Sequence, residues 1–85
     1  MPVVQLSSQI YICIQMDIKN RFGQKVKELR ILKGISQESL ANLAEIDRTY
    51  ISDIEKGDRN VSITIVEKLA IALNEDICVL FSYEK

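Results

Sequence analysis

Polar and charged side chains recur at helical spacing between residues 48 and 56. On a helix that turns by about 100° per residue, an arc of about 140° holds five of them: Arg48, Thr49, Ser52, Asp53 and Lys56. Ile51 and Ile54 fall on the opposite side, where they can anchor the helix to a core. The arc therefore presents donors and acceptors of the kind that bind base edges and phosphates in the major groove of DNA.

Each side chain in this stretch favours its own contact. Arg48, at the first helical position, can donate two hydrogen bonds to guanine O6 and N7, which is worth about 1–3 kcal/mol of discrimination. Thr49 can offer its hydroxyl, or its methyl group to thymine. Asp53 can accept from cytosine N4 or hold an arginine in place. Tyr50 lies at the flank of the arc, where its hydroxyl can reach a phosphate or a base edge.

Two short helices joined by a tight turn would position this arc. Ser36 is an N-cap residue for a helix over residues 37–44. Asp47 caps a second helix over residues 48–56, which Gly57 ends. A helix-turn-helix of this size presents its second helix to the major groove.

Residues outside the second helix can add contacts to the DNA backbone. Gln37 starts the first motif helix, where free backbone N–H groups can join it in binding a phosphate. Arg59 and Asn60, in the loop after the motif, either meet the backbone or belong to a plain surface loop. The net charge of the chain is −1, but residues 17–33 carry six basic and two acidic side chains. This basic segment either lies beside the second motif helix and binds phosphates, or is a solvated helix face.

Three further helices are predicted around the motif, so the expected fold class is all-α with five helices. They cover residues 18–33, 63–73 and about 77–82, and Asp17 and Ser62 cap the first two. Inward-facing apolar residues recur at helical spacing in these two helices: Ile18, Phe22, Val26, Leu29 and Leu32, then Ile63, Val66, Leu69, Ala70 and Leu73.

The last two helices carry more apolar residues than one small core can bury. The surplus includes Ile65, Ile71, Ile77, Leu80 and Phe81. Because large exposed apolar patches usually mark interfaces, we predict a two-fold homodimer through these helices. The alternative is that most of these residues close the core.

The 85 residues make one domain with an N-terminal extension. We assign residues 17–85 to a DNA-binding and dimerisation domain and residues 1–16 to the extension. Ile10, Ile12 and Ile14 alternate as in a strand, which would have to pair, for instance with its copy in a dimer. The other interpretation is a translated leader before a natural start at Met16.

Composition argues against several classes of protein. The chain has no histidine, no Gly-rich phosphate loop, no nucleophile beside a base and no metal-ligand spacing. We therefore expect no enzyme, no metal and no cofactor. Cys13 and Cys78 are expected to be thiols, not a disulfide. With no membrane span and no signal peptide, we expect a cytoplasmic protein.

The run SQESLANLAEIDRTYISDIEKG, residues 36–57, resembles the Cro/cI-type (XRE-like) helix-turn-helix family. The resemblance extends from Phe22 to about Phe81. Within it, DRTYISDIEKGDRNVSI, residues 47–63, is similar to the controller proteins of restriction–modification systems. These are small dimeric activator-repressors that set the order in which methyltransferase and endonuclease are expressed. The resemblance implies a lambda-repressor-like fold and a homodimeric regulator that binds two half-sites in double-stranded DNA. It also implies that the protein is prokaryotic and associated with the nucleoid.

The resemblance also implies roles for individual residues. Base contacts would come from Arg48, Thr49 and Ser52 or Asp53 with Tyr50 nearby, and phosphate contacts from Gln37 and Asn60. Arg30 and Glu55 would form an ion pair behind the second motif helix. Glu45 stands where the family often has glycine, and a left-handed backbone there would cost about 1 kcal/mol or more. Glu38 matches a position through which the lambda-type repressor activates transcription, which makes RNA polymerase a candidate partner.

Two other functions remain open at this point. One is a phage-type or other small repressor, which would use the same DNA-binding surface. The other is an antitoxin or protein-binding module that uses the fold without DNA. A partner that co-purifies with the protein, and DNA binding without salt dependence, would favour the second.

Overall fold

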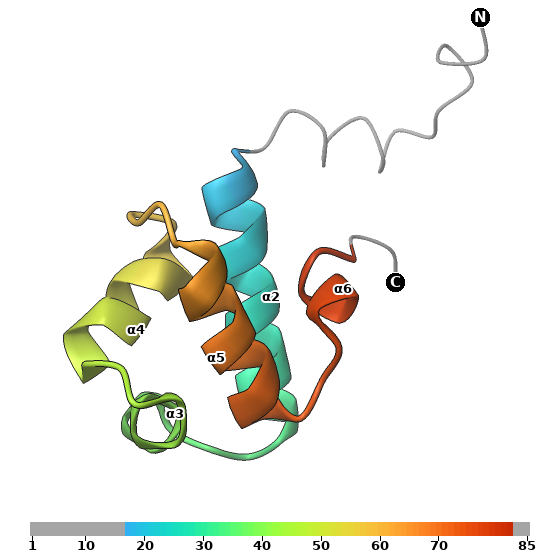
Figure 1. Cartoon of the computed structure of the whole chain (residues 1–85). Coiled ribbons are helices and arrows are strands. Elements are labelled where there is room, and N and C mark those ends of the chain that lie inside the picture. Colours follow the sequence, from blue (N-terminus) through green and yellow to red (C-terminus); the bar gives the residue numbers. More distant parts are fainter. Residues whose placement is uncertain (1–16, 83–85) are drawn as a thin grey trace, which may run out of the picture.

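The computed structural model describes residues 17–82, which form five α-helices (Figure 1). Their bounds are Ile18–Leu32 for α2, Gln37–Ala44 for α3, Arg48–Lys56 for α4, Ile63–Leu73 for α5 and Ile77–Leu80 for α6. The predicted all-α, five-helix fold is therefore confirmed over this range. The predicted N-terminal strand and the alternative start at Met16 lie outside the described residues.

Short polar side chains fix where four of the helices begin. Each accepts a hydrogen bond from a backbone N–H of its own first turn, which satisfies one of the donors that a helix start leaves unpaired. The pairs are Asp17 with Lys19, Ser36 with Ser39, Asp47 with Thr49 and Ser62 with Ile65. The predicted starts of all four helices are confirmed. They could be predicted because each cap acts within its own first turn.

The turn between α3 and α4 is made by a residue in the left-handed conformation. Glu45 has φ 59° and ψ 46°, and the N–H of Ile46 donates to the carbonyl of Ala41. A side chain at such a position costs about 1–2 kcal/mol of backbone strain. The chain nevertheless makes the tight turn that a helix-turn-helix requires.

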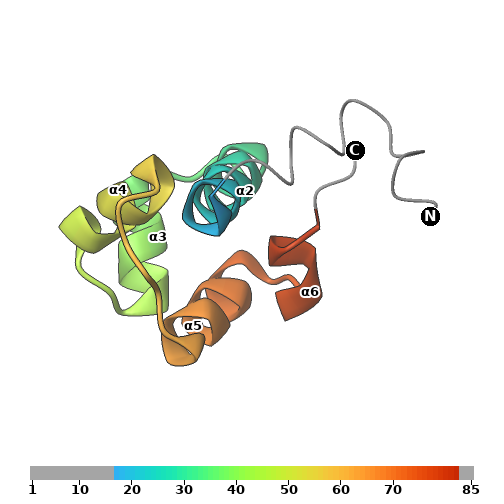
Figure 2. The ribbon, with the colours of Figure 1, turned by 90° about the horizontal axis from the view of Figure 1, so that it is seen from above.

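Helices α2 and α5 lie between the α3–α4 pair on one side and α6 on the other (Figures 1 and 2). Helix α2 packs against α4, α5 and α6, and α3 packs against both α4 and α5. The core between them is apolar: Phe22, Val26, Leu29, Leu40, Ala41, Ala44, Ile51, Ile54, Val66, Leu69, Ala70, Leu73 and Leu80. This arrangement makes α2 and α5 the frame on which the motif helices rest.

Three residues expected to face the core are exposed instead. They are Ile18, Leu32 and Ile63. Each is the first or last residue of its helix, so it lies past the layer of side chains that closes the core. Helical spacing predicted the correct face for these residues, but a face is buried only where a neighbouring helix covers it.

The C-terminal segment closes the core more than the sequence predicted. Leu80 is fully buried, and the ring of Phe81 stacks on that of Phe22 with centroids 5.3 Å apart. Ile65 is half-buried and packs on the same core. The assignment of Leu80 to a dimer interface is therefore wrong, because its side chain has no surface left to offer. Of the five predicted interface residues, Ile71 and Ile77 remain exposed.

A glycine that the sequence analysis did not single out lets α2 approach α4 closely. Gly23 is buried against the backbone of α4, and a Cβ atom built on it would overlap the carbonyl oxygen of Ile54. The separation of the two helices is therefore set by backbone contact. This contact fixes the depth at which α4 rests on the frame.

Candidate nucleic-acid interface

Helix α4 exposes the face that the sequence predicted. Ile51 and Ile54 are buried beneath it, whereas Arg48, Thr49 and Lys56 are exposed. Ser52, Asp53 and Tyr50 are half-buried along the same helix. The aliphatic side thus anchors the helix, and the polar arc faces outward.

The two cations of the arc are available for binding. Within residues 17–82, no hydrogen bond or ion pair is found for the side chain of Arg48 or of Lys56. Asp47 caps the helix through its bond to the Thr49 N–H, 2.9 Å long, and so orders the turn that carries Arg48. The guanidinium can therefore use all its donors on an external acceptor.

An ion pair between α2 and α4 forms as the resemblance implied. The Nε of Arg30 lies 2.7 Å from Oε2 of Glu55, and its Nη2 lies 3.1 Å from Oε1. The Nη1 of Arg30 donates to the carbonyl of Ile35 at 3.0 Å. The two side chains are only 12% and 3% exposed, so this two-point pair holds α4 from behind and leaves Arg30 unavailable to DNA.

The predicted phosphate ligand Gln37 is tied to the same carboxylate. Its Nε2 donates to Oε1 of Glu55 at 3.0 Å, which links the start of α3 to α4. The amide group keeps a second N–H and its oxygen for other partners. Glu55 thus positions Gln37 as well as α4, the second helix of the motif and its recognition helix.

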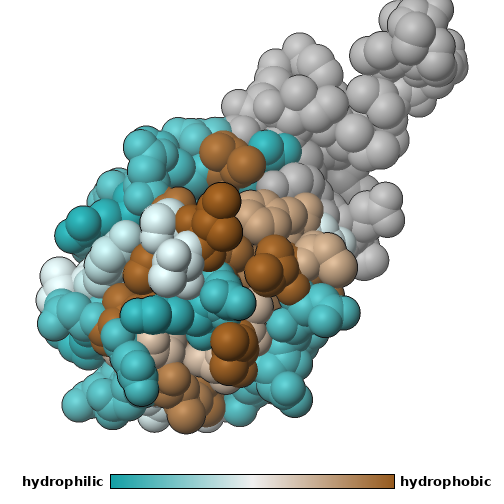
Figure 3. Space-filling model, in the orientation of Figure 1, coloured by the Kyte–Doolittle hydropathy of each residue, from teal (hydrophilic) through white to brown (hydrophobic). Residues whose placement is uncertain are grey.

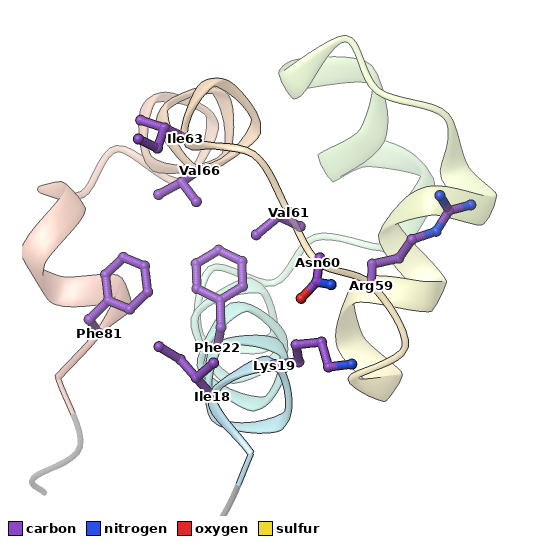
Figure 4. A pocket seen from close by; sticks show the side chains of 9 residues that line it. All are labelled: Ile18, Lys19, Phe22, Arg59, Asn60, Val61, Ile63, Val66 and Phe81. Carbon is purple, nitrogen blue, oxygen red and sulfur yellow. The ribbon is translucent and has the colours of Figure 1, made fainter.

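Arg59 lies in the loop after α4, and its side chain contacts two residues of α4, which the sequence did not predict. Its Nε lies 3.3 Å from Oδ2 of Asp53, and its Cζ lies 4.5 Å from the centroid of the Tyr50 ring. In Figure 4 the Arg59 side chain extends along α4 and away from the rings of Phe22 and Phe81. This places a third cation at the edge of the polar arc.

Asn60 lies beside this cation, at the rim of an apolar hollow of about 240 Å³. Lys19, from the start of α2, lines the same rim (Figure 4). Asn60 is exposed, so its predicted contact with the DNA backbone stays a prediction. The N-terminal end of α2 and the loop that follows α4 therefore line the same hollow.

The basic residues of α2 do not form one continuous phosphate-binding stripe. Lys25 pairs with Glu28 at 3.1 Å, and Lys33 pairs with Glu75, beyond α5, at 3.3 Å. Lys19 pairs with Asp17 at 3.8 Å and lines the same hollow as Arg59 and Asn60. The local charge excess seen in the sequence is therefore spread around the helix and partly neutralised.

The part of the chain that the structure describes contains no group of three or more residues suited to hold a metal ion. None of its helices is long and apolar enough to cross a membrane. Cys78 is an exposed free thiol on α6. None of these features competes with α4 as the candidate binding surface.

The fold and the outward recognition helix define a DNA-binding helix-turn-helix architecture. The helix-turn-helix family model matches residues 26–80, which span the C-terminal part of α2 and all of α3, α4, α5 and α6. The chain therefore belongs to the helix-turn-helix family.

Among its relatives, several are controller proteins. The chain is 51% identical over 67 residues to control protein C.MunI from Mycoplasma sp., covering 78% of this chain and 90% of the relative. It is 52% identical over 58 residues to control protein C.BamHI from Bacillus amyloliquefaciens, covering 67% and 72%. The structure of the restriction-modification controller protein C.AhdI from Aeromonas hydrophila superposes with a TM-score of 0.73 at 48% identity, covering 74% of this chain and 96% of that one.

Proposed function

We propose that this protein is a sequence-specific DNA-binding regulator of transcription that controls a restriction–modification system. It acts as a homodimer on an operator with two half-sites. The observation that carries the proposal is the placement of Arg48 and Thr49, exposed at the start of an α4 that is anchored from behind. The sequence of this chain is about 50% identical to those of two control proteins, which supports the controller role.

The residues of the arc and its surroundings have distinct roles in DNA binding. Arg48, Thr49 and Ser52 read base edges in the major groove, and Tyr50 contacts the flank of the site. Gln37, at the start of α3, and Lys56, at the end of α4, bind phosphates on either side. The protein therefore works as a binder and not as a catalyst.

A binding titration tests the proposed function. The DNA upstream of the protein's own gene and a shuffled DNA of equal length are each titrated by fluorescence anisotropy at several salt concentrations. We expect the upstream DNA to bind about 10³-fold tighter or more, and both affinities to fall as salt rises. Equal affinity for the two DNAs would contradict the proposal. Binding without salt dependence, together with a co-purifying protein, would favour the protein-binding module.

The exposed apolar residues of α5 and α6 support the dimer. Figure 3 shows hydrophobic surface among the polar residues over the side of the molecule where these helices lie. Ile71 is 72% exposed on α5 and Ile77 is 44% exposed on α6. Pairing two copies through this face would remove both side chains from water, which a lone protomer of this size cannot do.

We expect Ile71→Glu to convert the dimer to a monomer. Burying a carboxylate twice in a symmetric interface, with the loss of two buried isoleucines, raises the dimer dissociation constant at least about 100-fold. Sedimentation velocity measures the oligomeric state, and the operator titration should show a matching loss of affinity. Ile31→Glu is the matched control, because Ile31 is 58% exposed on α2. If Ile71→Glu stays as dimeric as Ile31→Glu, the interface lies elsewhere.

Activation through RNA polymerase is part of the same proposal. Glu38, in the first turn of α3, is exposed, as are Glu45 and Asp47 in the turn before α4. These carboxylates can meet a basic surface of a polymerase bound beside the operator. As a regulator of transcription, the protein acts in the cytoplasm, at the nucleoid.

A further inference from the structure

The contact between Arg59 and α4 is built from two residues one helical turn apart. Tyr50 and Asp53 are neighbours on the surface of α4 at i and i+3 spacing. The Arg59 guanidinium lies 4.5 Å from the Tyr50 ring centroid, and its Nε lies 3.3 Å from Oδ2 of Asp53. The loop after Gly57 therefore folds back and places a cation against the recognition helix.

This contact adds little to the stability of the fold. The side chains of Arg59 and Asp53 are 46% and 28% exposed, so water screens their attraction. The ion pair that holds α4 to α2 is separate, because it uses Arg30 and Glu55. The Arg59–Asp53 contact can thus open on binding without loosening the helix.

Its position gives the contact a role in recognition. Asp53 lies at the edge of the polar arc, so its carboxylate faces the same side as the base-reading residues. An arginine paired with a carboxylate cannot give the same donors to a phosphate. Asp53 therefore competes with DNA phosphates for the Nε donor of Arg59, and the contact holds the guanidinium against α4.

Resting on the DNA-binding function proposed above, we infer that Asp53 is a specificity-determining residue that acts through Arg59. On DNA of arbitrary sequence, Asp53 meets no suitable hydrogen-bond donor, so it stays paired with Arg59. Each protomer then lacks the phosphate contact that Arg59 could make. On the operator, the amino group of a cytosine offers Asp53 a replacement donor. Arg59 is then released to a phosphate, so the extra contact forms only on the correct sequence.

A double-mutant cycle tests this inference. Asp53→Asn, Arg59→Gln and the double variant are titrated against random-sequence DNA across salt concentrations, with the wild type alongside. We expect Asp53→Asn to raise affinity about threefold to tenfold and to steepen the slope of log affinity against log salt by about 0.9 per protomer, one phosphate contact each. In the Arg59→Gln background the same substitution should change neither quantity.

Asp58→Asn is the matched control, because Asp58 carries the same charge as Asp53 and lies next to Arg59 in the loop, but its carboxylate does not pair with Arg59. We expect it to leave the salt slope unchanged. Operator affinity should not rise in Asp53→Asn, so the ratio of operator to random affinity falls by the same threefold to tenfold. Far-UV circular dichroism confirms that each variant is folded.

Three outcomes would overturn the inference. The first is an equal gain from Asp53→Asn with and without Arg59, which would mean that Asp53 acts through its own charge. The second is an equally large effect of Asp58→Asn. The third is no change in Asp53→Asn. If the wild type itself shows no preference for its operator, the proposed function fails instead, and the two failures are distinguishable in one data set.

Discussion

Replacing Glu55 with alanine is expected to lower the free energy of unfolding by about 3–5 kcal/mol, the cost of leaving a buried charge unpaired. The Glu55 side chain is 3% exposed and accepts hydrogen bonds from Arg30 and Gln37. Without it, the Arg30 guanidinium stays buried without its counter-ion. Because a domain of this size has only about 5 kcal/mol of stability, a large share of the variant should be unfolded at 25 °C. Urea denaturation followed by far-UV circular dichroism measures the change.

Two further variants show whether Glu55→Ala is destabilising because Arg30 loses its buried counter-ion or only because a side chain is removed. Replacing both Arg30 and Glu55 with methionine removes both charges, and we expect stability within about 2 kcal/mol of the wild type. Glu28→Ala breaks the exposed pair with Lys25 and should cost less than about 1 kcal/mol. If Glu55→Ala is no more harmful than Glu28→Ala, the buried pair is not what holds α4 in place.

Replacing Arg48 with alanine should remove discrimination at one base pair in each half-site. A two-point contact between arginine and guanine is worth about 1–3 kcal/mol, and a homodimer loses it twice. The Arg48 side chain is exposed at the start of α4, so the substitution should leave the fold intact. Competition titrations with operators changed at single base pairs measure the effect. At one symmetric position the variant should no longer distinguish the original base from the others.

Lys56→Ala is the control for this experiment. It removes one exposed cation from the other end of α4, so it should weaken all sequences alike and reduce the salt slope by about 0.9 per protomer. Arg48→Ala should instead weaken the operator far more than random DNA. If Arg48→Ala binds operator and random DNA as the wild type does, α4 does not enter the groove in the proposed way.

The starts of the helices could be predicted from the sequence because caps act over two or three residues. Asp17, Ser36, Asp47 and Ser62 each bond to a backbone N–H of the turn that follows. The extent of the core could not be predicted in the same way. Helical spacing predicts a face, but it does not say where the opposing helix stops. Ile63 is therefore exposed at the start of α5 although it shares the core-facing spacing.

The same distinction separates the predicted and missed parts of the candidate site. The outward arc of α4 follows from helical geometry alone, and the structure places Arg48 and Thr49 on it. The contact of Arg59 with Asp53 depends on how the loop after Gly57 turns back, which no periodicity encodes. The assignment of Leu80 to an interface failed for a related reason, because whether α6 folds inward depends on the space beside Phe22.

Gly23 has a consequence for how such a protein changes its target. Its bare backbone, the two isoleucines beneath α4 and the Arg30–Glu55 pair hold that helix, and none of them lies in the polar arc. The residues that decide folding are thus physically separate from those that choose a sequence. Substitutions in the arc would leave these supporting contacts unchanged. Evolution or protein engineering can therefore change the DNA target of the protein by substituting a few exposed residues of α4.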